Sequence, residues 1–201
     1  NITEPSATGK AVGKYPVEFA KDTVGQPDTT GNYIVATVVP GLLEITPVET
    51  EVVVTITGHT GSHTYDGSEK TVTDYDWKAT INGKETTLYT KNDFSFDGTA
   101  EVKGTDAKTY PMGLKDSDFK NTSKNFTNVT FVVNDGSLTI NPAEVTLTAK
   151  SAKLPYNGED QTVTGYTCSE KDVTFDNITE PSATGKAVGK YPVEFAKDTV
   201  G

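Results

Sequence analysis

The sequence has one cysteine, Cys168, and no arginine. A single cysteine cannot form a disulfide within the chain, so packing and hydrogen bonds must hold the fold together. All 18 basic residues are lysines, and 28 acidic residues bring the formal charge to −10. Nucleic-acid and phosphate binding normally rely on basic grooves and on the two-pronged hydrogen bonds of arginine, so both functions are disfavoured.

Long hydrophobic runs are absent as well. No stretch approaches the roughly 20 apolar residues that a membrane-spanning helix needs. Residues 1–10 have neither the positive cluster nor the apolar core of a signal peptide. We therefore expect a segment without a membrane span that begins inside a longer protein.

β-Branched residues dominate the composition instead. There are 34 threonines and 21 valines against 7 leucines. Side chains branched at Cβ are stiff at χ1 and pack well on a pleated surface. The composition predicts an all-β protein.

The sequence repeats itself. Residues 1–25 recur without a change at residues 177–201, so the two start positions differ by 176. The identity extends to solvent-facing lysines such as Lys10 and Lys14, which convergent packing cannot explain, whereas tandem duplication can. We expect the chain to be one 176-residue period plus an overlap, within a longer array.

One period contains two related modules. Tyr65-Asp66-Gly67 leads into Thr71-Val72-Thr73, and Tyr156-Asn157-Gly158 leads into Thr162-Val163-Thr164 with the same spacing. The predicted parts are residues 1–47, the C-terminal part of a short module; residues 48–142, a complete long module; and residues 143–201, the N-terminal part of the next short module.

Short β-branched runs bounded by Gly, Pro, Asn or Asp predict strands, for example at residues 51–57 and 128–133. Asn82-Gly83 predicts a type I′ hairpin between residues 77–81 and 84–89. Residues 114–121 are the one segment that could form a helical turn, with Asp116 or Ser117 as its cap.

These motifs resemble the MBG-type immunoglobulin-like repeats of bacterial surface adhesins. The resemblance rests on the Tyr-Asp/Asn-Gly turn, the Thr-Val-Thr strand, the Gly-x(4-5)-Tyr segment and the Gly-x-Leu-x-Ile-x-Pro end, and it covers nearly all of both modules. It implies tandem antiparallel Ig-like β-sandwich modules in long extracellular stalks, usually of Gram-positive bacteria. β-Grasp-like modules are the alternative, and the family brings no catalytic residues.

No group of residues predicts catalysis. His59 and His63 lie in a Gly-rich segment without a further ligand at metal spacing, so we interpret them as solvated loop histidines. Cys168 lacks a histidine in its own module that could act as a base. The residues whose oxygens could attract calcium are Asp116, Asp118, Asn121, Asn134 and Asp135. They do not follow the 12-residue calcium-loop pattern, and we expect no enzyme, no metal site and no cofactor.

The leading functional hypothesis is a structural stalk that projects a distal binding domain from the cell wall. A repeat that itself binds host glycan, mucin or protein is the second hypothesis, with Trp77 as a speculative contact. A self-assembling extracellular filament is the third. The expected partners are neighbouring copies of the repeat and, through domains outside this chain, a host-surface glycan or protein, but not nucleic acid.

The modules follow one another without a flexible linker. The junction residues are Thr46, Pro47, Val48, Asn141, Pro142 and Ala143. Because no Gly/Ser-rich segment separates the modules, we expect a semi-rigid array. The predicted location is extracellular, on a protein anchored to the cell wall.

Overall fold

A computed structural model describes residues 2–196 of the chain. The chain divides into two compact units, Asn1–Asn141 and Pro142–Gly201. Across the described residues the regular structure is β-strand, apart from two 3-10 turns of three residues each. The predicted all-β class is confirmed, while the division into three modules stays a prediction.

The strands of the first unit are β1 (Gly13–Val17), β2 (Gly41–Ile45), β3 (Val52–Gly58), β4 (Thr60–Thr64), β5 (Lys70–Thr73), β6 (Tyr75–Ile81), β7 (Lys84–Glu85), β8 (Phe94–Phe96), β9 (Glu101–Gly104), β10 (Thr109–Pro111), β11 (Phe119–Asn121), β12 (Val129–Asn134) and β13 (Ser137–Asn141). Its 3-10 turns are η1 (Lys91–Asp93) and η2 (Asp116–Asp118). The second unit has β14 (Leu147–Ala149), β15 (Gln161–Thr164), β16 (Tyr166–Cys168) and β17 (Ser182–Gly185).

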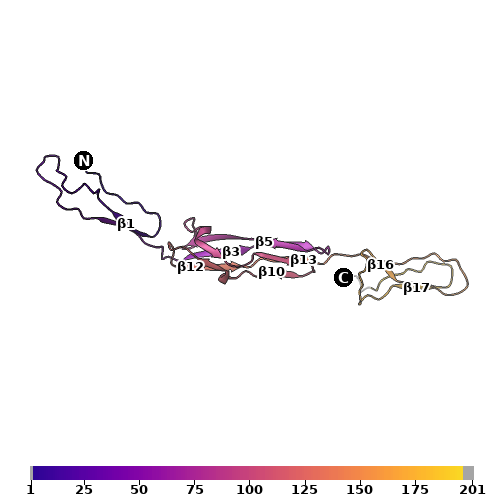
Figure 1. Ribbon diagram of the computed structural model, residues 1–201. Helices are drawn as coiled ribbons and strands as arrows, with labels where there is room; N and C mark the ends of the chain where they lie inside the picture. Colours follow the sequence, from indigo (N-terminus) through magenta and orange to yellow (C-terminus); the bar gives the residue numbers. More distant parts are fainter. Residues whose placement is uncertain (1, 197–201) are drawn as a thin grey trace. The chain divides into compact units, whose positions relative to one another are not determined.

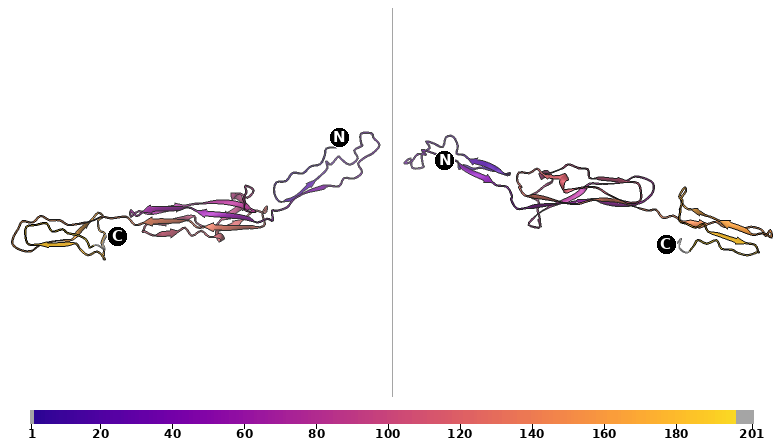
Figure 2. Two further views of the ribbon diagram at one scale, coloured as in Figure 1. Left: turned by 180° about the vertical axis from the view of Figure 1, so that it is seen from behind. Right: turned by 90° about the horizontal axis from the view of Figure 1, so that it is seen from below.

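β3 is one of the two inner strands of the largest sheet. This sheet has the order β12-β3-β6-β7 and lies within residues 48–141, the strand-rich part of the first unit (Figure 1, Figure 2). Val52, Val54 and Ile56 alternate along β3 and have no exposed surface. A β-branched run with period-2 alternation forms such a strand because one face of it can be buried completely.

Two parallel pairs are the main departure from the predicted antiparallel sandwich. β3 pairs parallel with β12, and β4 pairs parallel with β13. Parallel neighbours need a long crossover connection, and the chain between β3 and β12 provides one. No long helix crosses a sheet in residues 2–196, as the β-grasp alternative would require.

The predicted hairpin is confirmed. β6 and β7 pair antiparallel on either side of Asn82 and Gly83, whose φ angles are 51° and 73°. These positive values are those of a type I′ turn. β7 ends at Glu85, so the second strand is shorter than the expected run over residues 84–89.

The predicted helical turn is present as η2, but its expected cap was wrong. The residue before the turn is Lys115, and its backbone N–H donates to Asp118 Oδ2 at 2.8 Å. Asp116 instead accepts a hydrogen bond from the Val133 N–H at 2.9 Å. The carboxylate that closes the turn therefore comes from its third residue.

Two long chain segments change sheets where their backbones touch. β3 passes into β4 at Gly58, and β12 passes into β13 at Gly136. A Cβ atom on Gly58 would lie 2.4 Å from Gly136 N, and one on Gly136 would lie 2.4 Å from the His59 oxygen. Only glycine allows two backbones to approach so closely. We call this crossing the glycine waist.

Hydrogen bonds hold the glycine waist on several sides. The Ser137 N–H donates to the His59 oxygen at 3.1 Å, and the Met112 N–H donates to the Gly136 oxygen at 2.8 Å. The Asp135 carboxylate accepts the N–H groups of Gly113 and Leu114 at 2.9–3.0 Å. Backbone N–H and C=O groups that no longer pair within one strand ladder thus have hydrogen-bond partners before the next ladder begins.

The interior of residues 48–141 is one apolar core in two clusters. The first lies under β3 and contains Val52, Val54, Ile56, Ala79, Tyr89, Phe94, Phe119 and Phe126. The second contains Val102, Met112, Leu114, Leu138 and Ile140. Tyr75, Phe96 and Val133 pack against both clusters. The core therefore continues past the glycine waist.

Within residues 2–196 a glycine lies beneath a tyrosine ring three times. The pairs are Gly9–Tyr15, Gly104–Tyr110 and Gly185–Tyr191, and a Cβ on each glycine would lie within 2.2–2.3 Å of the ring. Each tyrosine hydroxyl donates to the backbone oxygen four residues earlier. The recurring Gly-x5-Tyr spacing is explained by this contact.

The Tyr-Asp/Asn-Gly turns also share a conformation. The Ser68 N–H donates to Asp66 Oδ1, and the Glu159 N–H donates to Asn157 Oδ1, at 2.9 and 3.0 Å. In both turns the glycine has a positive φ, 78° and 84°. The strands that follow pair alike, β5 with β9 and β15 with β17. The modules are therefore locally similar around this turn, as their sequences predict.

We predict that Gly136→Ala lowers the free energy of unfolding by about 2–3 kcal/mol, because the backbone atoms facing its Cβ cannot move aside. Urea denaturation of the two proteins measures the difference. Gly61→Ala is the matched control: its Cβ would meet the Val72 side chain, and the short module carries Ala152 at the corresponding position. An equal loss in both variants would contradict the role of the waist.

Candidate functional site

The speculative ligand contact, Trp77, packs into the core. It lies on β6 opposite Ile56 and is half-buried. Its ring meets Phe94 edge-on, with a centroid distance of 5.4 Å. The short module has Cys168 at the matching place, opposite Leu147. The alternation in the sequence did not decide which face of the sheet Trp77 lies on. The observed packing against Phe94 gives the indole a structural role in the long module.

An aromatic cluster surrounds this position. Tyr89 packs on Phe94 and Phe126, and Phe94 and Phe119 both pack on Phe131, with ring centroids 5.1–6.1 Å apart. Aromatic pairs at such distances add about 0.5–1.5 kcal/mol each beyond area burial. The cluster was not predicted, although the series of aromatic residues between the hairpin and β12 is a signal for it.

Lys91 extends across the cluster. Its ammonium nitrogen lies 4.3 Å from the Tyr75 ring centroid and 4.5 Å from that of Phe94, and it donates to the Tyr75 hydroxyl. A cation over aromatic faces is stabilised by the ring quadrupole. The lysine thus covers an aromatic surface with a charge, which disfavours stacking of a sugar at the same place.

Tyr89 is the most deeply buried ionisable group of the cluster. Its hydroxyl donates to the Asp93 backbone oxygen at 3.1 Å and to Asn121 Oδ1 at 3.2 Å. Burial, with the negative charge of Asp93 as the second cause, raises the pKa of Tyr89 to about 12. Both causes disfavour the phenolate, so the group serves packing rather than proton transfer at neutral pH.

The oxygen-bearing residues considered for calcium have local structural partners. Asp116, Asp118 and Asp135 each accept backbone N–H groups. Asn121 donates to the backbone oxygens of Ser123 and Phe126 at 3.1 and 2.9 Å. Among residues 2–196 no three His, Cys, Asp or Glu side chains gather in a group able to hold a metal.

The two histidines are exposed, but they are not both in a loop. His59 lies between β3 and β4, with Nδ1 2.9 Å from the Thr73 oxygen and Nε2 3.5 Å from an Asp76 carboxylate oxygen. His63 lies within β4, which runs through the segment expected to be a loop. The strand was not predicted because a Gly-rich composition is typical of a loop. Gly61 belongs in this strand because a Cβ at its position would meet the Val72 side chain.

The junction residues join directly to the strands of the long module. The Val48 N–H donates to the Asn125 oxygen at 2.8 Å, and Val48 packs against the first cluster. Asn141 ends β13, and its side chain donates to Ser62 Oγ at 3.0 Å and to the His63 oxygen at 3.4 Å. Thr46, Pro142 and Ala143 are exposed and Pro47 is half-buried.

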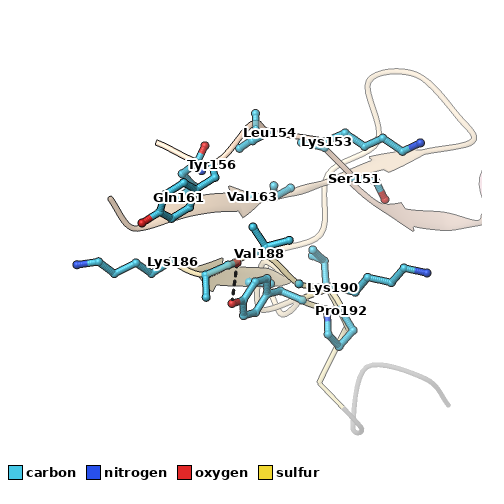
Figure 3. Close-up of a pocket in the computed structure, with 17 residues that line it drawn as sticks. Ser151, Lys153, Leu154, Tyr156, Gln161, Val163, Lys186, Val188, Lys190 and Pro192 are labelled. Atoms are coloured by element: carbon cyan, nitrogen blue, oxygen red, sulfur yellow. Dashed lines mark hydrogen bonds between the residues drawn. The ribbon is translucent and has the colours of Figure 1, made fainter. Parts of the chain in front are cut away.

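A cavity of about 590 Å³ lies in the second unit. Residues 151–154 line one side of it and residues 186–193 line the other, and Val163 lies opposite Val188 (Figure 3). The walls carry both apolar side chains and lysines. No sequence motif had predicted a ligand site at these residues.

Residues 52–142 match the family model of the MBG domain. These residues therefore form an MBG-type repeat, as the motifs of the long module predicted. The match begins with β3 and ends one residue after β13, so it covers both core clusters. No curated protein and no solved structure matches the chain.

An MBG domain indicates a surface-associated, extracellular repeat and is not typical of an enzyme. Within the described residues no helix is long and apolar enough to cross a membrane. The geometry around Trp77 and Tyr89 agrees with a structural module, because the chemically versatile side chains are engaged in packing and in local hydrogen bonds.

We predict that Trp77→Ala lowers the free energy of unfolding by about 2–4 kcal/mol, whereas Trp77→Phe costs clearly less, because the core loses a large half-buried ring only in the first case. Thermal unfolding followed by circular dichroism measures both. A Trp77→Ala protein as stable as the parent would show that the indole is free for a ligand.

We predict that ionisation of Tyr89 lowers the free energy of unfolding at alkaline pH. Its pKa is raised in the folded protein, so its contribution is complete below the ordinary tyrosine pKa of about 10 and is lost as pH rises toward 12. Urea midpoints at pH 8 and pH 11 should differ less in Tyr89→Phe than in the parent. Parallel pH curves for the two proteins would contradict this.

Proposed function

We propose that this chain is a structural repeat of a stalk that holds a distal binding domain away from the cell wall of a Gram-positive bacterium. The observation that carries the proposal is the parallel pairing of the first two strands of the long module with its last two, β3 with β12 and β4 with β13. The 176-residue repeat supports it, since tandem repeats that contact their neighbours add length.

Parallel terminal strands resist tension in a particular way. A pull on the chain before β3 and after β13 draws the two strands in opposite directions along their length. The hydrogen bonds of the β3–β12 and β4–β13 ladders are then loaded together in shear rather than one after another. This geometry suits a module that transmits force from one junction to the next.

The junctions fit the same role. Two residues, Thr46 and Pro47, separate the end of β2 from Val48, which is already hydrogen-bonded within the long module. After β13, the Thr146 N–H donates to Ser169 Oγ at 2.9 Å, five residues beyond Asn141. Such short connections leave little slack between modules.

A second candidate, direct ligand binding by the long module, has less support. Trp77 is engaged with Phe94, and Lys91 lies over the neighbouring rings. The net charge of −10 favours soluble, mutually repelling stalks instead. Adhesion is therefore assigned to domains outside this chain.

Single-molecule force spectroscopy tests the stalk proposal. Handles are attached to the thiols introduced by Glu49→Cys and Glu144→Cys in a Cys168→Ser background, so that the pull shears both parallel ladders. The matched control carries Glu49→Cys and Asn128→Cys, which pulls neighbouring ends of β3 and β12 apart. We expect a severalfold higher unfolding force for the first pair of handles; equal forces would contradict the proposal.

A further inference from the structure

The cavity of the second unit is a groove between two extended segments. Residues 151–154 form one wall and residues 186–193 form the other. Val188 is 89% exposed, and Leu154 and Tyr156 are 53% and 67% exposed. Leu154 and Tyr156 lie on one side in Figure 3, and Val188 faces Val163 from the other. Apolar side chains this exposed on a built groove point to a binding surface.

Part of one wall of the groove, residues 189–193, has a sequence that occurs a second time in the chain and has a strand partner there. Residues 189–193 have the same sequence as Gly13–Val17, which form β1 and pair antiparallel with β2. In that pair Tyr15 lies opposite Leu43. Residues 189–193 form no strand with any of residues 2–196. The identical sequence therefore has a strand partner at one end of the chain and lacks one at the other.

The long module shows how such a groove is filled. There β13 lies between β10 on one side and β4 on the other. Leu138 of β13 lies opposite Tyr110 and Gly61 and is fully buried. By the repeat, Tyr191 matches Tyr110 and Ala152 matches Gly61. A strand placed like β13 would run between residues 151–154 and residues 189–193.

The charges of the groove match β2. Glu44 takes the position of Thr139, which lies opposite Thr109 and Ser62 in the long module. The residues matching Thr109 and Ser62 are Lys190 and Lys153. Both lysines extend toward the same end of the groove from opposite walls (Figure 3). The pair Lys14–Glu44, 3.4 Å apart, already shows one of these contacts in the other copy of the sequence.

The segment that contains β2 has the complementary deficit. Tyr33, Ile34 and Val39 are 76%, 68% and 79% exposed. They lie before β2 in the sequence, just as β12 lies before β13. In the long module β12 pairs with β3. The counterpart of β3 in the second unit is β14, which pairs with β16 alone among the described strands. The segment before β2 thus exposes apolar residues, and β14 in the second unit has an edge that pairs with none of the described strands.

We infer that the groove binds residues 26–47 of a second copy of this repeat, with β2 inserted parallel to residues 151–154 and antiparallel to residues 189–193, which take the place that the identical β1 has beside β2. Leu43 and Ile45 point inward, and Glu44 lies between Lys153 and Lys190. The contact is head-to-tail, so it extends an array rather than closing a dimer. It rests on the proposed function and deepens it by naming the partner of each short module.

A labelled peptide of residues 26–47 tests the inference against the full chain by fluorescence anisotropy. We expect saturable binding that Lys153→Glu weakens severalfold, through repulsion of Glu44. A peptide with Glu44→Lys should bind the parent chain weakly and the Lys153→Glu chain better. Lys171→Glu, an exposed lysine of the same unit outside the groove, is the matched control and should change nothing.

Absence of binding, or binding that is insensitive to Lys153→Glu and to Glu44→Lys, would overturn the inference. If the peptide aggregates, a second protein tests the same inference. It is the chain extended after Gly201 by a second copy of residues 26–47. Amide hydrogen exchange at Lys190 and Tyr191 should slow in the extended chain, and unchanged exchange would also overturn it. The force measurement pulls on the long module alone, so it can fail or succeed independently.

Discussion

The backbone contact between Gly58 and Gly136 is the constraint on which the long module depends. Because neither residue has a side chain, the chain that carries β3 and β4 can lie against the chain that carries β12 and β13 while both change sheets. The two parallel ladders on either side of the contact follow from it. So does the continuous core, since Tyr75 and Phe96 reach both clusters at this level.

Much of this fold follows from local patterns in the sequence. The β-branched runs at residues 51–57 and 128–133, the Asn82-Gly83 turn and the repeated Tyr-Asp/Asn-Gly turns each have a short-range physical cause, and each was predicted correctly. The β-branched run at residues 33–39 was wrongly predicted to be a strand, since it forms only an isolated bridge at Ile34. The parallel pairing was not predicted, because it joins residues far apart in sequence and leaves no local signature beyond continuous apolar runs. The strand at His63 was missed for a similar reason, since its glycine and polar residues fit a strand only beside a particular neighbour.

The candidate site was harder to predict than the fold. Trp77 could be assigned to a face only once its neighbours were known, because the alternation around it is Asp-Trp-Lys and either side is compatible. The structure shows Phe94 against the indole, contributed by a segment seventeen residues away. Conversely, the Gly-x5-Tyr spacing was visible in the sequence, but its cause, a ring lying on a bare backbone, needs coordinates. Spacing thus identified the positions without identifying their contacts.

The inferred groove and the resistance to tension involve the same strand. In the long module the closing strand β13 fills the space between β10 and β4, and its parallel ladder with β4 is one of the two that tension shears. In the second unit the matching space is open, and β14 lacks a parallel neighbour among the described strands. A short module therefore gains its closing strand and its resistance to shear in one event, when residues 26–47 of a second copy enter the groove. Because the partner that completes the module is also its next neighbour along the array, assembly and mechanical strength are coupled through a single β-strand.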